Sequence, residues 1–307
     1  MKIYTCDLFS IALPPQHSFP MAKYRLLRER IAAEGISGAE DVVAPRAATD
    51  AEILAVHTPD YLRRLHSGEL SQAEIRRIGL PWSPELVERA RRSAGATIAA
   101  CRMALTEGTA VNLGGGTHHA YPDHGQGYCL LNDAAIAARA MQFEGLVDRV
   151  LIVDCDVHQG NGTAAIFRND PRVFTFSIHG RNNFPLKKEA SDLDMALPDG
   201  TGDRDYLEAL QKGLAQAFSR ARAQLVIYLS GADAYEGDRF GKLKLSKQGL
   251  WNRDRLVFGF CREYRLPVAV TLAGGYAPEI DDIVDIHFQT VKAAEEFYRC
   301  WKGSAPL

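Results

Sequence analysis

Two aspartates and a histidine alternate over five residues of this chain. Asp154, Asp156 and His158 follow directly on the apolar run 151–153. Because side chains alternate along a strand, all three could project to the same side. Carboxylates buried there need a cation, and Asp233, after another apolar run, supplies a further ligand. One histidine and two aspartates leave a zinc ion with an open position for water and substrate. Taken alone, the motif could also be a helix cap beside a core histidine.

Two adjacent histidines form a second group. His118 and His119 follow three glycines, and an extended turn there could offer both imidazoles to one reacting centre as general base and general acid. Tyr276 follows Gly274 and Gly275, and its phenol could donate a hydrogen bond to the oxyanion that forms when water attacks an amide. The plainer alternatives are a glycine-rich surface loop and a core tyrosine.

Short apolar and β-branched runs are expected to form the strands that position these residues. The runs are residues 2–5, 110–113, 149–153, 173–178, 225–229 and 268–272. They alternate with helical patterns, which favours a parallel sheet covered by helices on both faces. Four runs lead into the polar residues above, and open α/β sheets bind ligands beyond the carboxyl ends of their strands. This edge of the sheet is therefore the predicted active site.

One helix is especially clear in the sequence. Ser83, Pro84 and Glu85 supply an N-cap, a first-turn proline and an early acid, and Gly108 marks the end. An apolar stripe runs along the residues between. We expect this helix to be a packing element.

Composition favours a soluble globular protein, and we expect a single domain over residues 1–307. The chain is 46% hydrophobic and 24% charged, and no linker-like stretch divides it. A formal net charge of -2 gives no basic footprint for nucleic acid. The six cysteines show no C-x-x-C spacing, which predicts reduced thiols and a cytoplasmic location. Asp7 interrupts any signal-like run and no long apolar stretch follows, so no membrane span is expected. The oligomeric state is left open.

Several of these segments resemble the zinc-dependent histone deacetylases. The matching stretches are residues 118–119, 127–133, 154–162, 230–233, 236–241 and 274–276. The likeness therefore covers most of the chain from about Ser83 to Tyr276. Residues 158–162, 236–239 and 252–254 are most similar to the class IV branch, in a bacterial-type homologue.

The resemblance implies a fold, a set of ligands and a set of roles. The fold is the arginase/deacetylase fold, with a single central eight-stranded parallel sheet and helices on both faces. Zinc, or alternatively iron(II), would be bound by Asp156, His158 and Asp233. The catalytic residues would be His118, His119, Tyr276 and Asp154, with Asp154 behind His118 and His119 as base. Gly127, Tyr128 and Phe184 would line the acyl channel, and potassium could bind near Asp154, Asp156, His158 and Ser177.

The activity implied is hydrolysis of the amide of an N-acylated lysine in a protein or peptide, with acyl length left open. A small-molecule deacylase, such as an acetylpolyamine amidohydrolase, is the alternative. It would need carboxylates at the channel mouth to meet a distal ammonium, and Asp192, Asp194 and Asp203 are the candidates. An arginase fits worse, because it binds two manganese ions through additional aspartates. In the segment 230–234, which follows the run 225–229, this chain has only Asp233. An inactive, ligand-binding family member would lack catalytic residues, and all are present.

Two positions depart from the family pattern. Asn161 stands where class I enzymes place a second acid, and a neutral amide raises the pKa of a neighbouring histidine less than a carboxylate does. We therefore expect His119 to be neutral near pH 7 and to act as the principal base. The segment 17–23 follows the family's proline-and-arginine segment only loosely, so no role in an internal exit cavity is assigned to Lys23.

Overall fold

One parallel sheet forms the centre of the protein. The computed structural model describes residues 1–14, 16–36 and 38–303. The strand order is β2-β1-β3-β8-β7-β4-β5-β6, and all neighbours pair in parallel. The strands are β1 (Ile3–Tyr4), β2 (Val42–Val43), β3 (Thr109–Asn112), β4 (Val150–Asp154), β5 (Val173–Gly180), β6 (Leu193–Leu197), β7 (Leu225–Ser230) and β8 (Val268–Leu272). The predicted eight-stranded parallel sheet is confirmed.

Each of the six predicted runs overlaps a strand, and most boundaries differ from the prediction by one or two residues. The two strands that were not predicted, β2 and β6, are the edges of the sheet. β2 has only two residues, and in β6 Asp194 interrupts the apolar pattern while no residue is fully buried. Short and polar edge strands protect a sheet from pairing with other chains, but they leave little periodic signal in the sequence.

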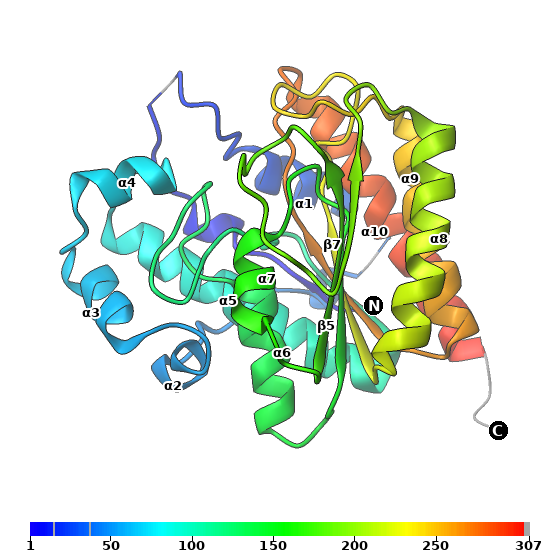
Figure 1. The fold of residues 1–307 in the computed structure, drawn as a ribbon, viewed down its shortest axis with the longest axis horizontal. Helices are drawn as coiled ribbons and strands as arrows, with labels where there is room; N and C mark the ends of the chain where they lie inside the picture. Colours follow the sequence, from blue (N-terminus) through cyan, green and yellow to red (C-terminus); the bar gives the residue numbers. More distant parts are fainter. Residues whose placement is uncertain (15, 37, 304–307) are drawn as a thin grey trace.

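Helices cover both faces of the sheet, as expected and as Figure 1 shows. The alternation along β4 sends Leu151 and Val153 into one core and Val150 and Ile152 into the other. The first core is covered by α1 (Lys23–Ala33), α8 (Asp203–Ala221), α9 (Lys247–Glu263) and α10 (Ile280–Gly303). The second is covered by α2 (Asp50–Leu54), α3 (Pro59–Ser67), α4 (Gln72–Ile78), α5 (Pro84–Glu107), α6 (Asp133–Phe143) and α7 (Asn161–Phe167).

The clearest predicted helix is confirmed as α5. The Ser83 side chain accepts a hydrogen bond from the backbone N–H of Leu86, and the helix ends at Gly108, where φ is 88°. Only a glycine adopts that conformation without strain. Among the described residues, no helix has both the length and the apolar character needed to cross a membrane.

Candidate active site and metal centre

Four neighbouring strands deliver the polar residues to one edge of the sheet. β3, β8, β7 and β4 are consecutive in the strand order, so the segments that follow them meet. One detail of the prediction is wrong: β4 ends at Asp154, and strand alternation does not extend to Asp156 and His158. A turn orients these two instead, because the N–H of Asp156 donates to Asp154 Oδ1 (3.1 Å) and the N–H of His158 donates to Asp156 Oδ1 (2.9 Å).

The three predicted metal ligands converge. One ligand atom from each of Asp156, His158 and Asp233 lies within 4.8 Å of the others. His158 Nδ1 is 3.0 Å from Asp156 Oδ1 and 3.2 Å from Asp233 Oδ2. The second carboxylate oxygen of each aspartate already accepts a hydrogen bond from the backbone. Gly274 N–H donates to Asp156 Oδ2 (2.8 Å), and Val157 N–H donates to Asp233 Oδ1 (3.0 Å).

This cluster is short of positive charge. Asp233 Oδ2 is buried and receives no well-aligned hydrogen bond from any described residue. Burial and the nearby charge of Asp156 raise the pKa of Asp233 to about 7. Buried carboxylates in such a position are stabilised by a cation. Two oxygens and an imidazole nitrogen suit a divalent ion such as zinc, so the residues fit the metal that the sequence predicts.

The close approach of the two aspartates depends on a glycine. A Cβ atom at Gly274 would lie 1.9 Å from Asp233 Oδ2 and 2.7 Å from Asp156 Oδ2. No side chain larger than hydrogen fits there without moving a ligand. Gly274 therefore shapes the metal centre through its size.

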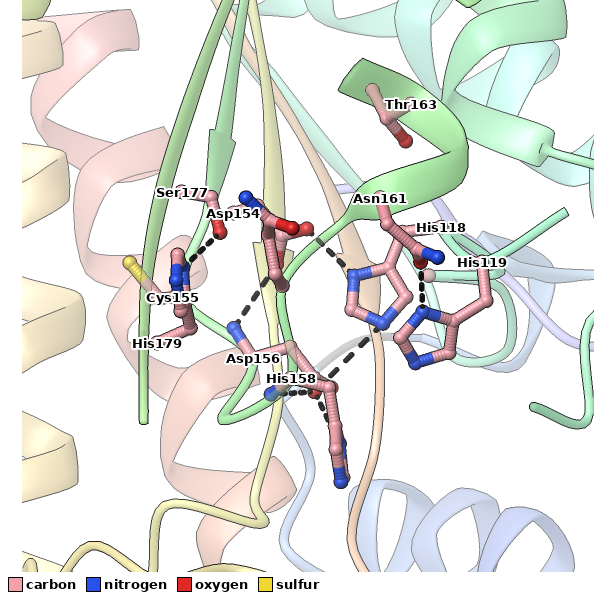
Figure 2. Close-up of polar contacts among 12 residues, drawn as sticks. His118, His119, Asp154, Cys155, Asp156, His158, Asn161, Thr163, Ser177 and His179 are labelled. Atoms are coloured by element: carbon pink, nitrogen blue, oxygen red, sulfur yellow. Dashed lines mark hydrogen bonds and ion pairs between the residues drawn. The ribbon is translucent and has the colours of Figure 1, made fainter. Parts of the chain in front are cut away.

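The histidine pair stands beside this cluster, with ring centroids 4.1 Å apart. His118 Nδ1 lies 2.6 Å from Asp154 Oδ2, and His119 Nδ1 lies 2.7 Å from Asn161 Oδ1 (Figure 2). Since both partners offer an oxygen, each ring holds its proton on Nδ1. The two Nε2 atoms are then left for chemistry.

The pKa values of the two histidines are shifted in opposite directions. Burial disfavours the charged form of His118, but the carboxylates of Asp154 and Asp156 outweigh it and raise its pKa to about 9. For His119, burial and the charges of His118 and His158 hold the pKa well below its usual value. The surroundings therefore favour the charged form of one ring and the neutral form of the other.

Tyr276 and the predicted channel residues surround the entrance to the pair. The N–H of Tyr276 donates to Asp238 Oδ2 (2.6 Å), and burial raises the pKa of its phenol, which stays protonated. Gly127 has a φ of +55°, and a Cβ there would lie 2.6 Å from His119 Cδ2. The Phe184 ring meets the His119 ring edge-on, with centroids 4.9 Å apart. Tyr128 completes the wall.

Two cavities meet at this entrance. Both are lined by His119, Gly127, Tyr128, His158 and Tyr276. The outer one is the mouth toward solvent, and the inner one extends past the histidines to Arg89 and Lys23. Lys23 is buried there, and its Nζ donates to Ala273 O (3.2 Å). The sequence assigned it no place in an internal cavity, because the surrounding segment matches the family poorly; the structure puts it in the cavity wall.

Comparison with known proteins decides the family. The model of the histone deacetylase domain matches residues 17–291. The chain belongs to the histone deacetylase family. It is 46% identical over 286 residues to an uncharacterized protein of Picosynechococcus sp., which covers 93% of this chain and 95% of that protein. It is 30% identical to Histone deacetylase 2 of Arabidopsis thaliana, over 88% of this chain and 72% of the relative.

Solved structures of similar fold support the predicted architecture. A histone deacetylase homologue from Aquifex aeolicus superposes with a TM-score of 0.82 at 22% identity, covering 97% of this chain and 88% of that one. The HD domain of HDA15 gives 0.81 at 23% identity, covering 99% and 95%. The arginase/deacetylase fold is therefore established for this family member.

Sequence reasoning did not single out Asn132, which holds the histidine loop. Its Nδ2 donates to Thr163 Oγ1 (3.0 Å) and to the backbone oxygens of Ala120 (3.2 Å) and His118 (3.4 Å). Its Oδ1 accepts from Ala135 N–H (3.0 Å) as the N-cap of α6. An asparagine before a helical pattern is an N-cap signal, but the contacts to the loop come only from the fold.

The predicted potassium residues also lie together. Ser177 of β5 pairs in register with Asp154 of β4. The Ser177 hydroxyl is 2.9 Å from His179 Nδ1 (Figure 2). The segment that could hold a monovalent ion thus adjoins the metal cluster.

Proposed function

We propose that this histone deacetylase family member hydrolyses the amide bond of N-acylated lysine with a zinc ion held by Asp156, His158 and Asp233. The observation that carries the proposal is the buried, unsatisfied Asp233 Oδ2 beside His158 Nδ1, a short distance from the histidine pair. When bound, a divalent ion there supplies Lewis acidity and lowers the pKa of a water from about 16 toward about 7. Iron(II) could supply the same chemistry.

The protein residues divide the proton transfers between them. Neutral His119 keeps its proton on Nδ1, toward Asn161, so its Nε2 accepts the proton of the attacking water. His118, held protonated by Asp154, donates to the departing amine. The protonated phenol of Tyr276 donates a hydrogen bond to the carbonyl oxygen as its negative charge develops. Gly127, Tyr128 and Phe184 enclose the acyl-lysine side chain.

A potassium ion near Asp154, Asp156, His158 and Ser177 belongs to the same proposal. It would stabilise the segment that carries the metal ligands. The likeness to class IV remains a prediction.

The charge of the mouth favours acyl-lysine over acylpolyamines. The three acids that a polyamine site could use are engaged elsewhere: Asp192 accepts from Thr175, Asp194 from Ser191 and Gln159, and Asp203 from Ser246. No Asp or Glu is among the described residues that line the mouth. A distal ammonium would meet no counter-charge there.

Metal removal tests the proposal. Protein stripped by a chelator should lose turnover of acetyl-, octanoyl- and myristoyl-lysine peptides and regain it with zinc. Asp233→Ala should abolish both zinc binding, measured by metal content, and turnover. Asp281→Ala, an exposed carboxylate of α10, is the control and should change neither. Turnover by Asp233→Ala at the parent's rate would refute the proposal.

A further inference from the structure

The mouth of the site carries unpaired positive charge. Arg76 and Arg77, in the last turn of α4, and Lys242, in the loop before α9, line it. All three are exposed. Within the described part of the chain, no carboxylate lies within ion-pair distance of any of them, whereas most other arginines of α3 to α5 have an acidic partner, such as Arg64 with Glu74. These cations are therefore available to a ligand.

Backbone hydrogen bonds fix two of these residues to opposite walls of the channel. The N–H of Gly127 donates to Arg77 O (3.1 Å), and the N–H of Tyr128 donates to Ile78 O (2.7 Å). Arg77 is thus attached to the wall that Gly127 and Tyr128 form. An acyl-lysine inserted along this wall would leave its own backbone beside α4.

The second wall carries Lys242. Its N–H donates to Asn183 Oδ1 (3.2 Å), and Asn183 Nδ2 donates to Phe240 O (2.7 Å). Asn183 directly precedes Phe184, the opposite wall of the channel. The mouth is therefore flanked by a positive charge on each side of the point where the substrate enters.

Asp238, in the segment that leads to Lys242, is not free to neutralise these charges. Asp238 is buried and accepts from the backbone N–H groups of Phe240 (2.8 Å), Gly241 (3.0 Å) and Tyr276 (2.6 Å). Its charge is used to hold the Tyr276 segment. The positive charges of Arg76, Arg77 and Lys242 therefore attract anions to the mouth of the channel.

We propose that Arg76, Arg77 and Lys242 select acyl-lysine peptides whose neighbouring residues are Asp or Glu. This inference rests on the proposed function, because an acyl-lysine side chain in the channel places its flanking residues at the mouth. Carboxylates on either side of the lysine would meet a cation on either wall. Exposed charges act mainly on the rate of encounter, so their effect weakens with salt.

The test compares acetyl-lysine peptides that differ only in flanking residues: Glu, Gln or Lys on both sides. With the zinc-loaded enzyme at low salt, kcat/KM should be about fivefold to tenfold higher for the Glu peptide than for the Lys peptide, and the gap should shrink at high salt. Arg77→Gln and Lys242→Gln should each reduce the difference in kcat/KM between the Glu peptide and the Lys peptide. Arg262→Gln is the matched control: Arg262 is exposed at the end of α9, which leads to the amino end of β8, opposite the site.

The outcomes separate the two proposals. Turnover of all three peptides with no difference between them, or a difference that the mouth variants leave unchanged, overturns the selection of acidic peptides. If no peptide is turned over, the proposed function fails, and calorimetric binding of the same peptides still tests selection at the mouth. Turnover of Nε-acetyl-lysine with a free carboxylate is compared with turnover of its methylamide, to test whether the substrate is a small anion. If negative charge raises turnover only for these two small molecules and not for the peptides, the peptide proposal is overturned.

Discussion

At the scale of single residues, the site depends on which polar atom faces which. His118 and His119 are neighbours in sequence, yet a carboxylate faces one and an amide faces the other. The same ring is thus expected to act as an acid in one case and as a base in the other. The family resemblance implied that Asp154 lies behind His118 and that a neutral Asn161 lies beside His119, and the structure places both partners there; the roles of acid and base stay predictions.

The Asn161→Asp variant tests the role of His119. A carboxylate 2.7 Å from Nδ1 in place of the amide oxygen favours the charged ring and raises the pKa of His119. Because the base must be neutral, the acidic limb of the pH profile of kcat/KM should move to higher pH. Asn182→Asp, which adds the same charge at the exposed mouth, should move it much less. An unmoved limb in Asn161→Asp would show that His119 is not the principal base.

Zinc should stabilise the folded protein only when all three ligands are intact. A ligand that binds the native state alone raises stability by RT ln(1 + [L]/Kd), about 3 kcal/mol at a hundredfold excess over Kd. We therefore expect added zinc to raise the Tm of the stripped parent and leave Asp233→Asn unchanged. Asp281→Asn should behave as the parent does. An equal rise in parent and Asp233→Asn would place the zinc elsewhere.

At the scale of elements, strand ends and helix starts set the positions of these atoms. The sequence predicted the central strands, because buried parallel strands read as continuous apolar runs. It did not predict β2 and β6, whose short or polar sequences carry no such signal. Nor could it show that Asn132 joins α6 to the histidine loop, or that Lys242 lies across the mouth from Arg77, because both depend on long-range packing.

Gly274→Ala tests how the end of β8 meets the end of β7. The new Cβ would lie 1.9 Å from Asp233 Oδ2, so the ligand must move and zinc affinity should fall at least tenfold. The control, Gly259→Ala, adds a methyl group within α9 where no atom lies within 4 Å. It should raise stability by about 0.5–1 kcal/mol. Zinc titrations measure the affinity of each variant, and thermal melts measure its stability. Unchanged zinc affinity in Gly274→Ala would contradict the steric argument.

Asn132→Ala tests the link between α6 and the histidine loop. The variant loses an N-cap, which costs about 1 kcal/mol, and three hydrogen bonds that hold the loop. We expect kcat to fall at least tenfold while KM changes little, because the substrate does not contact Asn132. Thr49→Ala removes the N-cap of α2 and should reduce stability without slowing turnover. If both variants lose stability and neither loses kcat, Asn132 is a cap only.

At the scale of the whole molecule, burial favours the neutral form of several histidines outside the metal site. Burial lowers the pKa of His57 to about 4, and that of His179 likewise to about 4, and it holds the pKa of His287 well below the usual value. A buried imidazole without a counter-charge favours its neutral form. Folding therefore opposes proton uptake at positions far apart in the fold, and the protein should be sensitive to acid.

His57 offers the sharpest measurement of this effect. Its Nε2 accepts from the N–H of Asn132 (3.0 Å), so protonation would break that contact as well as bury a charge. The unfolded chain takes up the proton near pH 6.5 and the folded chain only near pH 4, so stability is lost as pH falls through this interval, by up to about 3 kcal/mol. In His57→Gln, whose side-chain oxygen can accept the same bond, the free energy of unfolding should fall less between pH 7 and pH 5. His66→Gln, at an exposed position in α3, should follow the parent; parallel curves for all three proteins would mean that His57 is not the source of the acid sensitivity.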